Sequence, residues 1–363
     1  MRQRDAGFTL VELMVGITLG LLLTGAVISV FVGSRTAYQA TSGTGALADS
    51  GRFALDMIQA AARGAGFLAC SHTNTLKTGT ENLLAAAPGS PLPYDFSHAI
   101  SGYEATGTSP GGTLTLAASP PQNAANSNWT PTLDSTFGSA TTQAQVLGSD
   151  VLVLRSSAPK MQPAYLSTGI TAGALSFTAL NAGQLQASQL AVISDCSTWF
   201  TFQIGAVTAG TPATITLSGG NTGGIPVGMV TGAVITPVTT VVYYIGVGSD
   251  NYPGLRRLEL IGGSTTFTDE ELVPDIDNMQ VLYGVDTTGT QTASEYVTAD
   301  QVTNFDAVVS IKVAVLSASP LGSAPKPAAA LTYNLLNTTV TAPIDTRARQ
   351  VFAITVGVRD ALQ

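Results

Sequence analysis

The sequence is short of charge, and this shortage excludes several classes of function. Lys, Arg, Asp and Glu make up 10% of the 363 residues, whereas Gly, Ala, Ser and Thr abound. This balance favours an exported, strand-rich protein over a cytosolic enzyme. The formal net charge of -8 argues against nucleic acid as a partner, because that affinity depends on Lys and Arg neutralising phosphates.

Histidine is equally scarce, with His72 and His98 as the two examples, each in a polar stretch. They are too few for a histidine-rich metal site, and they give no support to a Ser-His-Asp arrangement. No GxxxxGK[ST] or strand-linked GxGxxG pattern occurs, so nothing indicates nucleotide binding. We therefore predict that the protein is not an enzyme and has neither a cofactor nor a metal.

Acidic residues cluster late in the chain, at Asp269, Glu270 and Glu271 and again at Asp275 and Asp277. Carboxylate oxygens are calcium ligands, but solvated turns that contain acids are far commoner than calcium sites. We do not expect calcium there. The nearby sequence DNYPG at residues 250–254 predicts the turn of a hairpin.

The chain has two cysteines, Cys70 and Cys196, which lie far apart and outside any CxxC pattern. This spacing indicates neither a zinc ribbon nor thioredoxin chemistry. We predict a disulfide between them, which requires an oxidising compartment; the alternative is two buried free thiols. In the chain-entropy model, closing so long a loop stabilises the fold by roughly 4 to 5 kcal/mol.

A long apolar segment lies near the N-terminus. No residue from 13 to 32 is charged, and twenty residues of helix reach about 30 Å, the thickness of a bilayer's hydrocarbon core. Arg2 and Arg4 precede the segment and are expected to keep that end cytoplasmic. A secretory signal would place a small-residue cleavage site after the apolar run, and none follows. We predict an anchor that is not cleaved after the apolar run, with the bulk of the chain on the far side of the membrane.

Glu12 lies inside this apolar segment, where an ionised carboxylate is costly. Insertion scales put acidic residues at a helix centre near roughly +2.5 to +3.5 kcal/mol, and less toward the edge. The plain alternative is a carboxylate that reaches the nearby headgroups. Otherwise Glu12 needs a partner.

The sequence GFTLVELMV at residues 7–15 closely resembles the processing motif of type IV prepilins and pseudopilins. The resemblance implies that a dedicated membrane peptidase cleaves between Gly7 and Phe8 and methylates the new amino terminus. It also implies that Glu12 pairs with the N-terminal ammonium of a neighbouring subunit. In a low-dielectric environment, two such charges stabilise each other strongly when brought together.

Beyond the anchor, residues 41–45 are poor helix formers and interrupt the helical pattern. The pattern resumes at residues 47–63 with helical periodicity. Apolar residues share one face and polar residues the other, so an amphipathic helix is predicted that packs on a globular head and stops at Gly64 and Gly66. The alternative is a separate surface helix after a true loop. The apolar face comprises Leu47, Ala54, Ile58 and Ala61.

The remaining sequence predicts a strand-rich head. Candidate strands are residues 151–154, 191–193, 238–245, 255–260 and 279–285, with alternating patterns at 311–315 and 352–358. Long polar stretches at 88–145 and 175–224 are interpreted as elaborations of the sheet. The predicted class is α+β: a long N-terminal helix, half transmembrane and half amphipathic, packed on a β-rich, pilin-like head.

Several later stretches resemble the PilW-type minor pilins. They are SGRFALD at 50–56, AGF at 65–67 with Cys70, ISDC at 193–196, YYI at 243–245, LRRL at 255–258, ELVP at 271–274, NMQVLYGVD at 278–286 and the last strand at 349–359. The resemblance implies a low-abundance pilin that helps to prime pilus assembly in the inner membrane and lies at the fibre tip.

These observations give one expected organisation. Residues 1–7 are a leader, 8–33 a transmembrane and assembly helix, 34–66 its amphipathic continuation, and 67–363 a periplasmic head that reaches the cell surface after assembly. The expected partners are other minor and major pilins, the prepilin peptidase, the inner-membrane assembly platform and the lipid bilayer. The alternatives are a minor pseudopilin of type II secretion and a membrane-tethered adhesin or binding module.

Overall fold

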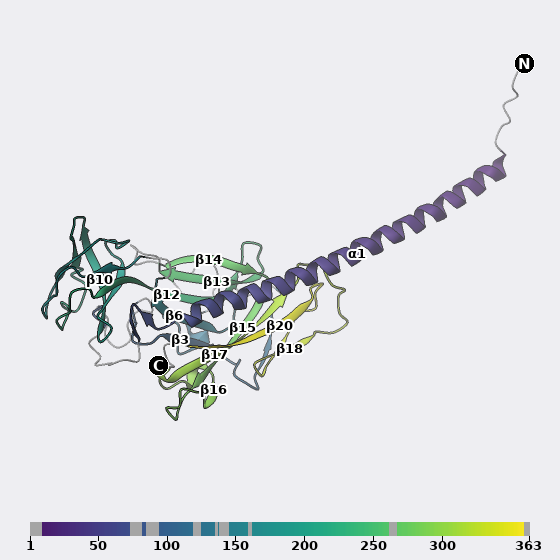
Figure 1. The fold of residues 1–363 in the computed structure, drawn as a ribbon. Helices are drawn as coiled ribbons and strands as arrows, with labels where there is room; N and C mark the ends of the chain where they lie inside the picture. The colour runs from purple at the N-terminus through teal and green to yellow at the C-terminus, as the bar shows by residue number, and fades with distance from the viewer. Residues whose placement is uncertain are drawn as a thin grey trace, which may run out of the picture.

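A computed structural model describes residues 9–72, 82–84, 94–118, 125–134, 137, 145–158, 162–260 and 267–358. Gly7 and Phe8, at the predicted cleavage site, lie outside these residues. Figure 1 shows one long helix that projects from a strand-rich head, with the N-terminus at its free end. The predicted α+β class with a long N-terminal helix is therefore confirmed.

Helix α1 (Leu10–Arg63) has 54 residues and is about 80 Å long at 1.5 Å per residue. It runs without interruption through residues 41–45, so the alternative of a loop there is wrong. The hydroxyl groups of Thr41 and Thr44 donate hydrogen bonds to the carbonyl groups one turn earlier, at 3.0 and 2.8 Å. Both side chains therefore bond within the helix that their propensity disfavours.

The helix ends at the predicted glycines. Gly64 is the C-cap, and Gly66 has a φ of +86°, a backbone conformation that side chains other than glycine rarely adopt. The Gly66 N–H donates to the carbonyl of Arg155 at 2.8 Å. The chain thus turns off the helix directly onto the head.

One face of the second half of α1 is buried against the head. Leu47, Ala54 and Ile58 are buried as predicted, and Ala61 is half-buried. Two glycines on this face allow a close approach: a Cβ at Gly51 would lie 2.2 Å from the Phe352 ring. The buried residues of the helix are Gly43, Leu47, Gly51, Ala54, Leu55, Ile58 and Ala62.

The helix packs on a four-stranded antiparallel sheet, which we call the helix-packed sheet. Its strands, in spatial order, are β16 (Glu295–Val297), β15 (Ile276–Val285), β17 (Val308–Ala318) and β20 (Arg349–Gly357). Ile311, Val313 and Val315 of β17 belong to the core that also contains the buried helix residues. The alternating Ala314 and Leu316 belong to a smaller core with Leu335 and Val340, so both faces of β17 are covered. That smaller core lies by β18 (Thr332–Leu335), β19 (Thr338–Thr341) and β4 (Thr113–Thr115).

The largest sheet of the head has eleven strands. Its main path is β5 (Trp129–Thr130), β3 (Ile100–Ala105), β6 (Val151–Ser157), β12 (Val234–Val247), β9 (Leu190–Ser194), β10 (Trp199–Thr208), β11 (Ala213–Leu217) and β8 (Ser176–Ala179). Off this path lie β7 (Ala164–Tyr165), β13 (Pro253–Leu260) and β14 (Phe267–Pro274). The short β1 (Phe67–Leu68) and β2 (Ser71–His72) form a hairpin, and 3₁₀ turns occupy Asn126–Asn128, Ala299–Gln301 and Phe305–Ala307.

The predicted strands are all present, but one polar stretch is more central than expected. Residues 88–145 were interpreted as an elaboration, yet β3 lies inside the sheet, next to β6. Trp129 is 2% exposed, and its indole N–H donates to the carbonyl of Ser149 at 2.9 Å. The predicted turn at 250–254 joins β12 to β13, where the Gly248 N–H donates to the carbonyl of Tyr252 at 2.7 Å.

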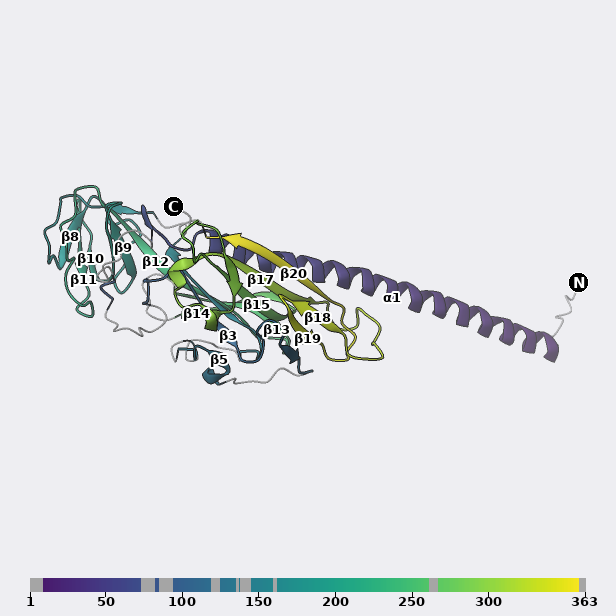
Figure 2. The same cartoon turned by 90° about the horizontal axis from the view of Figure 1, so that it is seen from below.

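Residues 162–235 form a separate lobe that we call the wing. Figures 1 and 2 show β8, β10 and β11 at the end of the molecule opposite the N-terminus. The strands close on themselves, because β7 pairs with the start of β12 and Leu166, next in sequence, bridges Ala179 of β8. Alternate residues such as Phe200, Phe202 and Ile204 fill the interior.

Candidate functional site

The free half of α1 is the first candidate site. Its large apolar residues are exposed, among them Leu22 at 71% and Phe31 at 68%. In the part of the chain that the structure describes, α1 is the one helix long and apolar enough to cross a membrane. An apolar surface of this length needs a bilayer or other helices around it.

Glu12 lies in the first turn of this helix. Its carboxylate accepts hydrogen bonds from the Thr9 N–H at 3.1 Å and the Thr9 hydroxyl at 2.9 Å. The Thr9 hydroxyl oxygen in turn accepts from the Glu12 N–H at 3.3 Å, which completes a capping box. Such a box fixes the start of the helix. The pairing of Glu12 with a neighbour's amino terminus stays a prediction.

The structure joins Cys70 and Cys196 in a disulfide, with 4.9 Å between their Cα atoms. Cys70 lies in the β1–β2 turn that follows α1, and Cys196 lies between β9 and β10 of the wing. The bond therefore links the end of the helix to the wing. Because both cysteines are bonded to each other, neither offers a reactive thiol.

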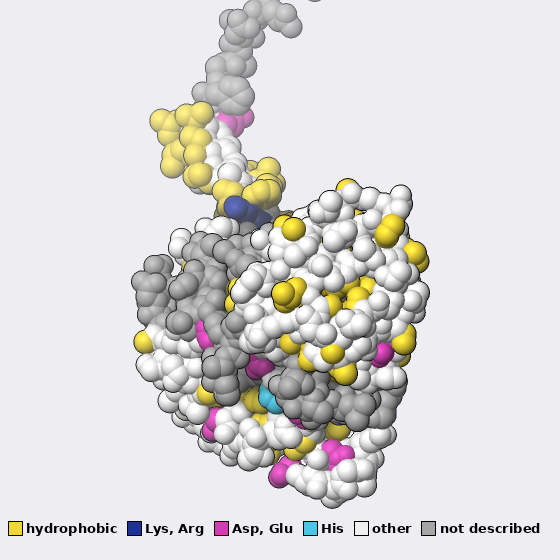
Figure 3. All heavy atoms as spheres, turned by 90° about the vertical axis from the view of Figure 1, so that its left-hand side faces the viewer, with side chains coloured by type: hydrophobic (Ala, Val, Ile, Leu, Met, Phe, Trp, Pro, Cys, Tyr) yellow, Lys and Arg dark blue, Asp and Glu magenta, His cyan; other side chains and the backbone are white. Residues whose placement is uncertain are grey.

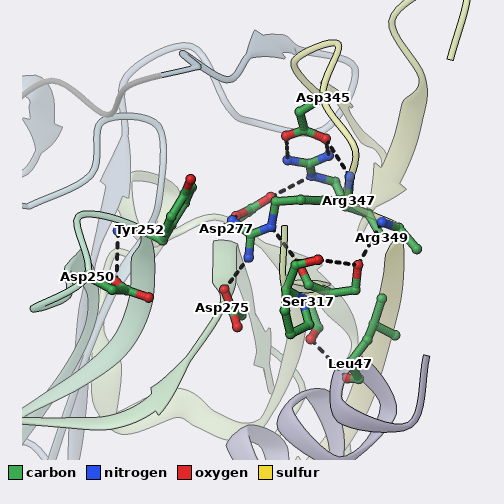
Figure 4. A network of polar contacts seen from close by, with 12 residues as sticks. Leu47, Asp250, Tyr252, Asp275, Asp277, Ser317, Asp345, Arg347 and Arg349 are labelled. Atoms are coloured by element: carbon green, nitrogen blue, oxygen red, sulfur yellow. Dashed lines mark hydrogen bonds and ion pairs between the residues drawn. The ribbon is translucent and has the colours of Figure 1, made fainter. Parts of the chain in front are cut away.

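A network of charged side chains lies where β15 and β20 begin (Figure 4). Arg349 donates two hydrogen bonds to Asp345, at 2.8 and 2.6 Å, and a third from Nε to Asp277 at 2.6 Å. Arg347 donates to Asp275 and, through Nε, to the carbonyl of Ser319 at 2.6 Å. Two cations thus compensate three carboxylates in a largely buried position.

Burial and pairing shift the pKa values of this network. Burial raises the pKa of Asp345, but hydrogen bonds and charge from Arg349 outweigh burial and hold it below its ordinary value. Burial also lowers the pKa of Arg349, and its bonds to Asp345 and Asp277 more than reverse that effect. Both groups therefore stay ionised at neutral pH.

The remaining acids of the late cluster are also paired with arginines. Asp269 is fully buried at its side chain and lies 3.1 Å from Nε of Arg256. Glu271 lies 3.7 Å from the same guanidinium, and Glu270 pairs with Arg257. These carboxylates balance arginines across the β13–β14 pair.

His98 is half-buried and paired. Its side chain is 33% exposed, and Nδ1 lies 2.7 Å from a carboxylate oxygen of Asp306. The side chain of His72 lies outside the described residues. Sequence reasoning missed the arginine partners: Asp277 and Arg349 lie in β15 and β20, and Asp275 and Arg347 lie just before these strands.

Two family models match this chain. Residues 242–360 match the family described as Type IV Pilus-assembly protein W, and residues 2–28 match the prokaryotic N-terminal methylation motif. Among solved structures, the chain is similar to the type IV-like pilin TTHA1219 from Thermus thermophilus, with 18% identity, a TM-score of 0.22, and coverage of 49% of this chain and 86% of that chain. No curated protein matches.

Proposed function

We propose that the chain is a type IV minor pilin that helps to initiate pilus assembly, on the matches of residues 242–360 to the PilW family and of residues 2–28 to the N-terminal methylation motif. In this proposal the prepilin peptidase cleaves after Gly7 and Phe8 becomes the new N-terminus. Glu12 then pairs with the amino terminus of a neighbouring pilin. The subunit is a structural component and has no catalytic role.

One observation carries the proposal: a single rigid helix is apolar and exposed along one half and docked on the head along the other. A tether alone does not need the apolar half to be continuous with the docked half. A subunit that leaves the bilayer for a helical bundle does, because the helix must transmit the position of the head to its neighbours. Apolar helix surfaces in such a bundle replace lipid contacts with protein contacts.

The proposed location is the inner membrane with the head in the periplasm, followed by the assembled fibre at the cell surface. Arg2 and Arg4 support this orientation through the positive-inside tendency. The disulfide between Cys70 and Cys196 supports an oxidising compartment for the head. The partners in this proposal are other pilins, the peptidase and the assembly platform.

The wing supports a position at the fibre tip. It lies at the end of the molecule opposite the membrane helix (Figure 1). A subunit that starts a fibre is followed by others from the membrane side, so its far end stays uncovered. The wing then remains free to contact whatever the fibre meets.

Replacing Glu12 tests the proposal, with variants that separate charge from helix capping. Glu12→Gln keeps the capping box, because Gln serves at that position as Glu does, but removes the charge. We expect normal membrane insertion and cleavage of this variant and its loss from sheared surface fibres. Glu12→Asp, which keeps the charge, should be incorporated far better. Unchanged incorporation of Glu12→Gln would refute the assembly role and favour a tethered module.

The nearest rival is a minor pseudopilin of type II secretion, whose N-terminal motif is similar. Deleting the protein distinguishes the two. Loss of surface fibres with intact protein secretion supports the pilus, and loss of secretion with intact fibres supports the rival. Mass spectrometry of the mature N-terminus tests the cleavage after Gly7 in either case.

A binding module is the second candidate function, favoured by the surface of the wing. Figure 3 shows that the end face carries mostly uncharged side chains with scattered apolar ones. Leu175, Leu180 and Val230 are 61%, 58% and 64% exposed. Such a surface suits an uncharged target. If the wing binds such a target, a variant that lacks wing residues should lose attachment to it while its fibres persist.

A further inference from the structure

A cavity of about 250 Å³ lies in the head, beside the charged network of Arg347 and Arg349. It is formed by β4 with the residues after it, by the β12–β13 turn and by the segment that leads into β20. Neither the proposed assembly role nor the family resemblance uses it. Its apolar lining comprises Leu114, Leu116, Val146, Leu147, Pro253 and Pro343.

The walls of the cavity are held in place by the surrounding fold. Leu114 packs so closely on Gly148 that a Cβ there would lie 2.5 Å from the leucine side chain. The Val146 N–H donates to the carbonyl of Ile245 at 2.9 Å. Tyr252, at another wall, has the Arg347 guanidinium 4.7 Å from its ring centroid. The cavity is therefore present before any ligand arrives.

The polar floor of the cavity consists of Asp277, Asp345, Arg347 and Arg349 (Figure 4). The two contacts of Arg349 with Asp345 use the fork of the guanidinium, the strongest geometry for such a pair. A charged ligand would have to compete with a pair that is already formed, and breaking a buried pair leaves an uncompensated charge. The floor therefore disfavours ions of either sign and accepts an uncharged group.

We propose that this cavity binds an uncharged aromatic or branched aliphatic group up to the size of an indole ring. An engineered apolar cavity of about 150 Å³ binds benzene, so the larger volume here has room for a second fused ring. The rigid apolar walls supply contact area, and the ring of Tyr252 offers an aromatic edge. The group is either a free small molecule or a side chain of another protein.

Titration with 5-fluoroindole tests the proposal on the full chain in lipid nanodiscs. Fluorine NMR should show line broadening beyond that of empty nanodiscs. Ala117→Phe fills the cavity from its lining and should reduce the excess broadening at least tenfold. Ala209→Phe, at an exposed position of the wing, is the matched control and should leave it unchanged. No excess broadening with the native chain, or equal broadening with Ala117→Phe, overturns the proposal.

A photo-crosslinking residue at Ala118, on the rim of the same cavity, distinguishes the two sources in cells. A crosslink to a defined protein band that Ala117→Phe abolishes assigns the group to a side chain of a neighbour. Fluoroindole binding without any crosslinked protein assigns it to a free ligand. Because neither readout requires fibres, the outcome is independent of the assembly test on Glu12.

Discussion

The wing and the helix-packed sheet are both built from antiparallel strands, but different interactions hold them. The wing contains one charged residue, Asp195, between residues 162 and 235, and its interior is filled by side chains such as Phe200 and Phe202. The helix-packed sheet combines an apolar core under α1 with the buried network of Arg347 and Arg349. The wing is thus held by apolar burial, whereas the helix-packed sheet is also held by ion pairs between specific residues, which we call directed pairing.

Directed pairing serves the region that must hold a defined orientation. Ion pairs fix which groups meet, whereas apolar burial tolerates many arrangements of similar volume. The Ser317 hydroxyl donates to the Leu47 carbonyl at 3.0 Å, which connects the helix to β17 beside the charged network. Among the described residues, the wing is tied to the end of the helix by the disulfide from Cys70 to Cys196. The two regions should therefore respond differently to the same perturbation.

The largest expected effect comes from replacing Cys70 and Cys196 together with Ala. The two cysteines are 126 residues apart, and the chain-entropy model gives about 5 kcal/mol for a loop of that length. The loss should appear as faster amide hydrogen exchange in the wing, with β15 and β17 little changed. Native protein treated with a reductant is the control. Equally faster amide exchange in the wing and in β15 and β17 would contradict the proposed difference between the two regions.

A smaller effect is expected where the helix meets β20. Gly51→Leu places a side chain against Phe352 and should lower the free energy of unfolding by about 1–3 kcal/mol. Gly45 has open space around its Cβ position, so Gly45→Leu should stabilise the helix by about 1 kcal/mol. Thermal unfolding of both variants measures the difference. Amide exchange in the wing should change with neither, and a shift there would show that the regions are coupled.

The helix and the strands could be predicted because their patterns are local. The apolar run and the amphipathic period at 47–63 predicted α1, and alternation at 311–315 predicted β17. The interruption at residues 41–45 was ambiguous because helix propensity is weak and tertiary contacts override it. There, Gly43 is buried, and a Cβ on it would lie 2.3 Å from Ser323. A contact between residues so far apart in sequence leaves no local signal.

The closure of the wing and the charged network could not be predicted, for the same reason. Arg349 and Asp277 are 72 residues apart, and Leu166 meets Ala179 through a bridge that only the folded sheet defines. Spacing showed which residues share a strand face, but it did not show which strands are neighbours. The motif around Glu12 was readable because its chemistry lies within a few consecutive residues.

A pair of buried acids also escaped the sequence analysis, since Glu104 lies in a stretch interpreted as polar elaboration. Glu104 and Asp150 are 5% and 2% exposed. Asp150 accepts hydrogen bonds from the N–H groups of Ala105 and Val281, at 3.0 and 2.8 Å. Oε2 of Glu104 has no hydrogen-bond partner among the described residues. Burial raises the pKa of both carboxyl groups, and the two N–H donors to Asp150 make it the more readily ionised of the pair.

This pair gives the smallest predicted effect; it lies outside the wing, and Asp150 bonds to Val281 of β15 in the helix-packed sheet. Burial, and next the charge of Asp150, raise the pKa of Glu104 above its ordinary value of 4.5. Because the pKa of Glu104 is raised in the folded state, its contribution to the free energy of unfolding is complete below about pH 4.5 and declines as pH rises. The decline is at most about 1.4 kcal/mol per pH unit. Glu104→Gln stays neutral and should flatten this slope between pH 6 and 8, whereas Asp150→Asn loses an acceptor and should destabilise at every pH. Urea unfolding at several pH values measures both slopes. Because the wing carries Asp195 as its sole charged residue, a slope that persists in Glu104→Gln and appears in wing amides would contradict the division between the two regions.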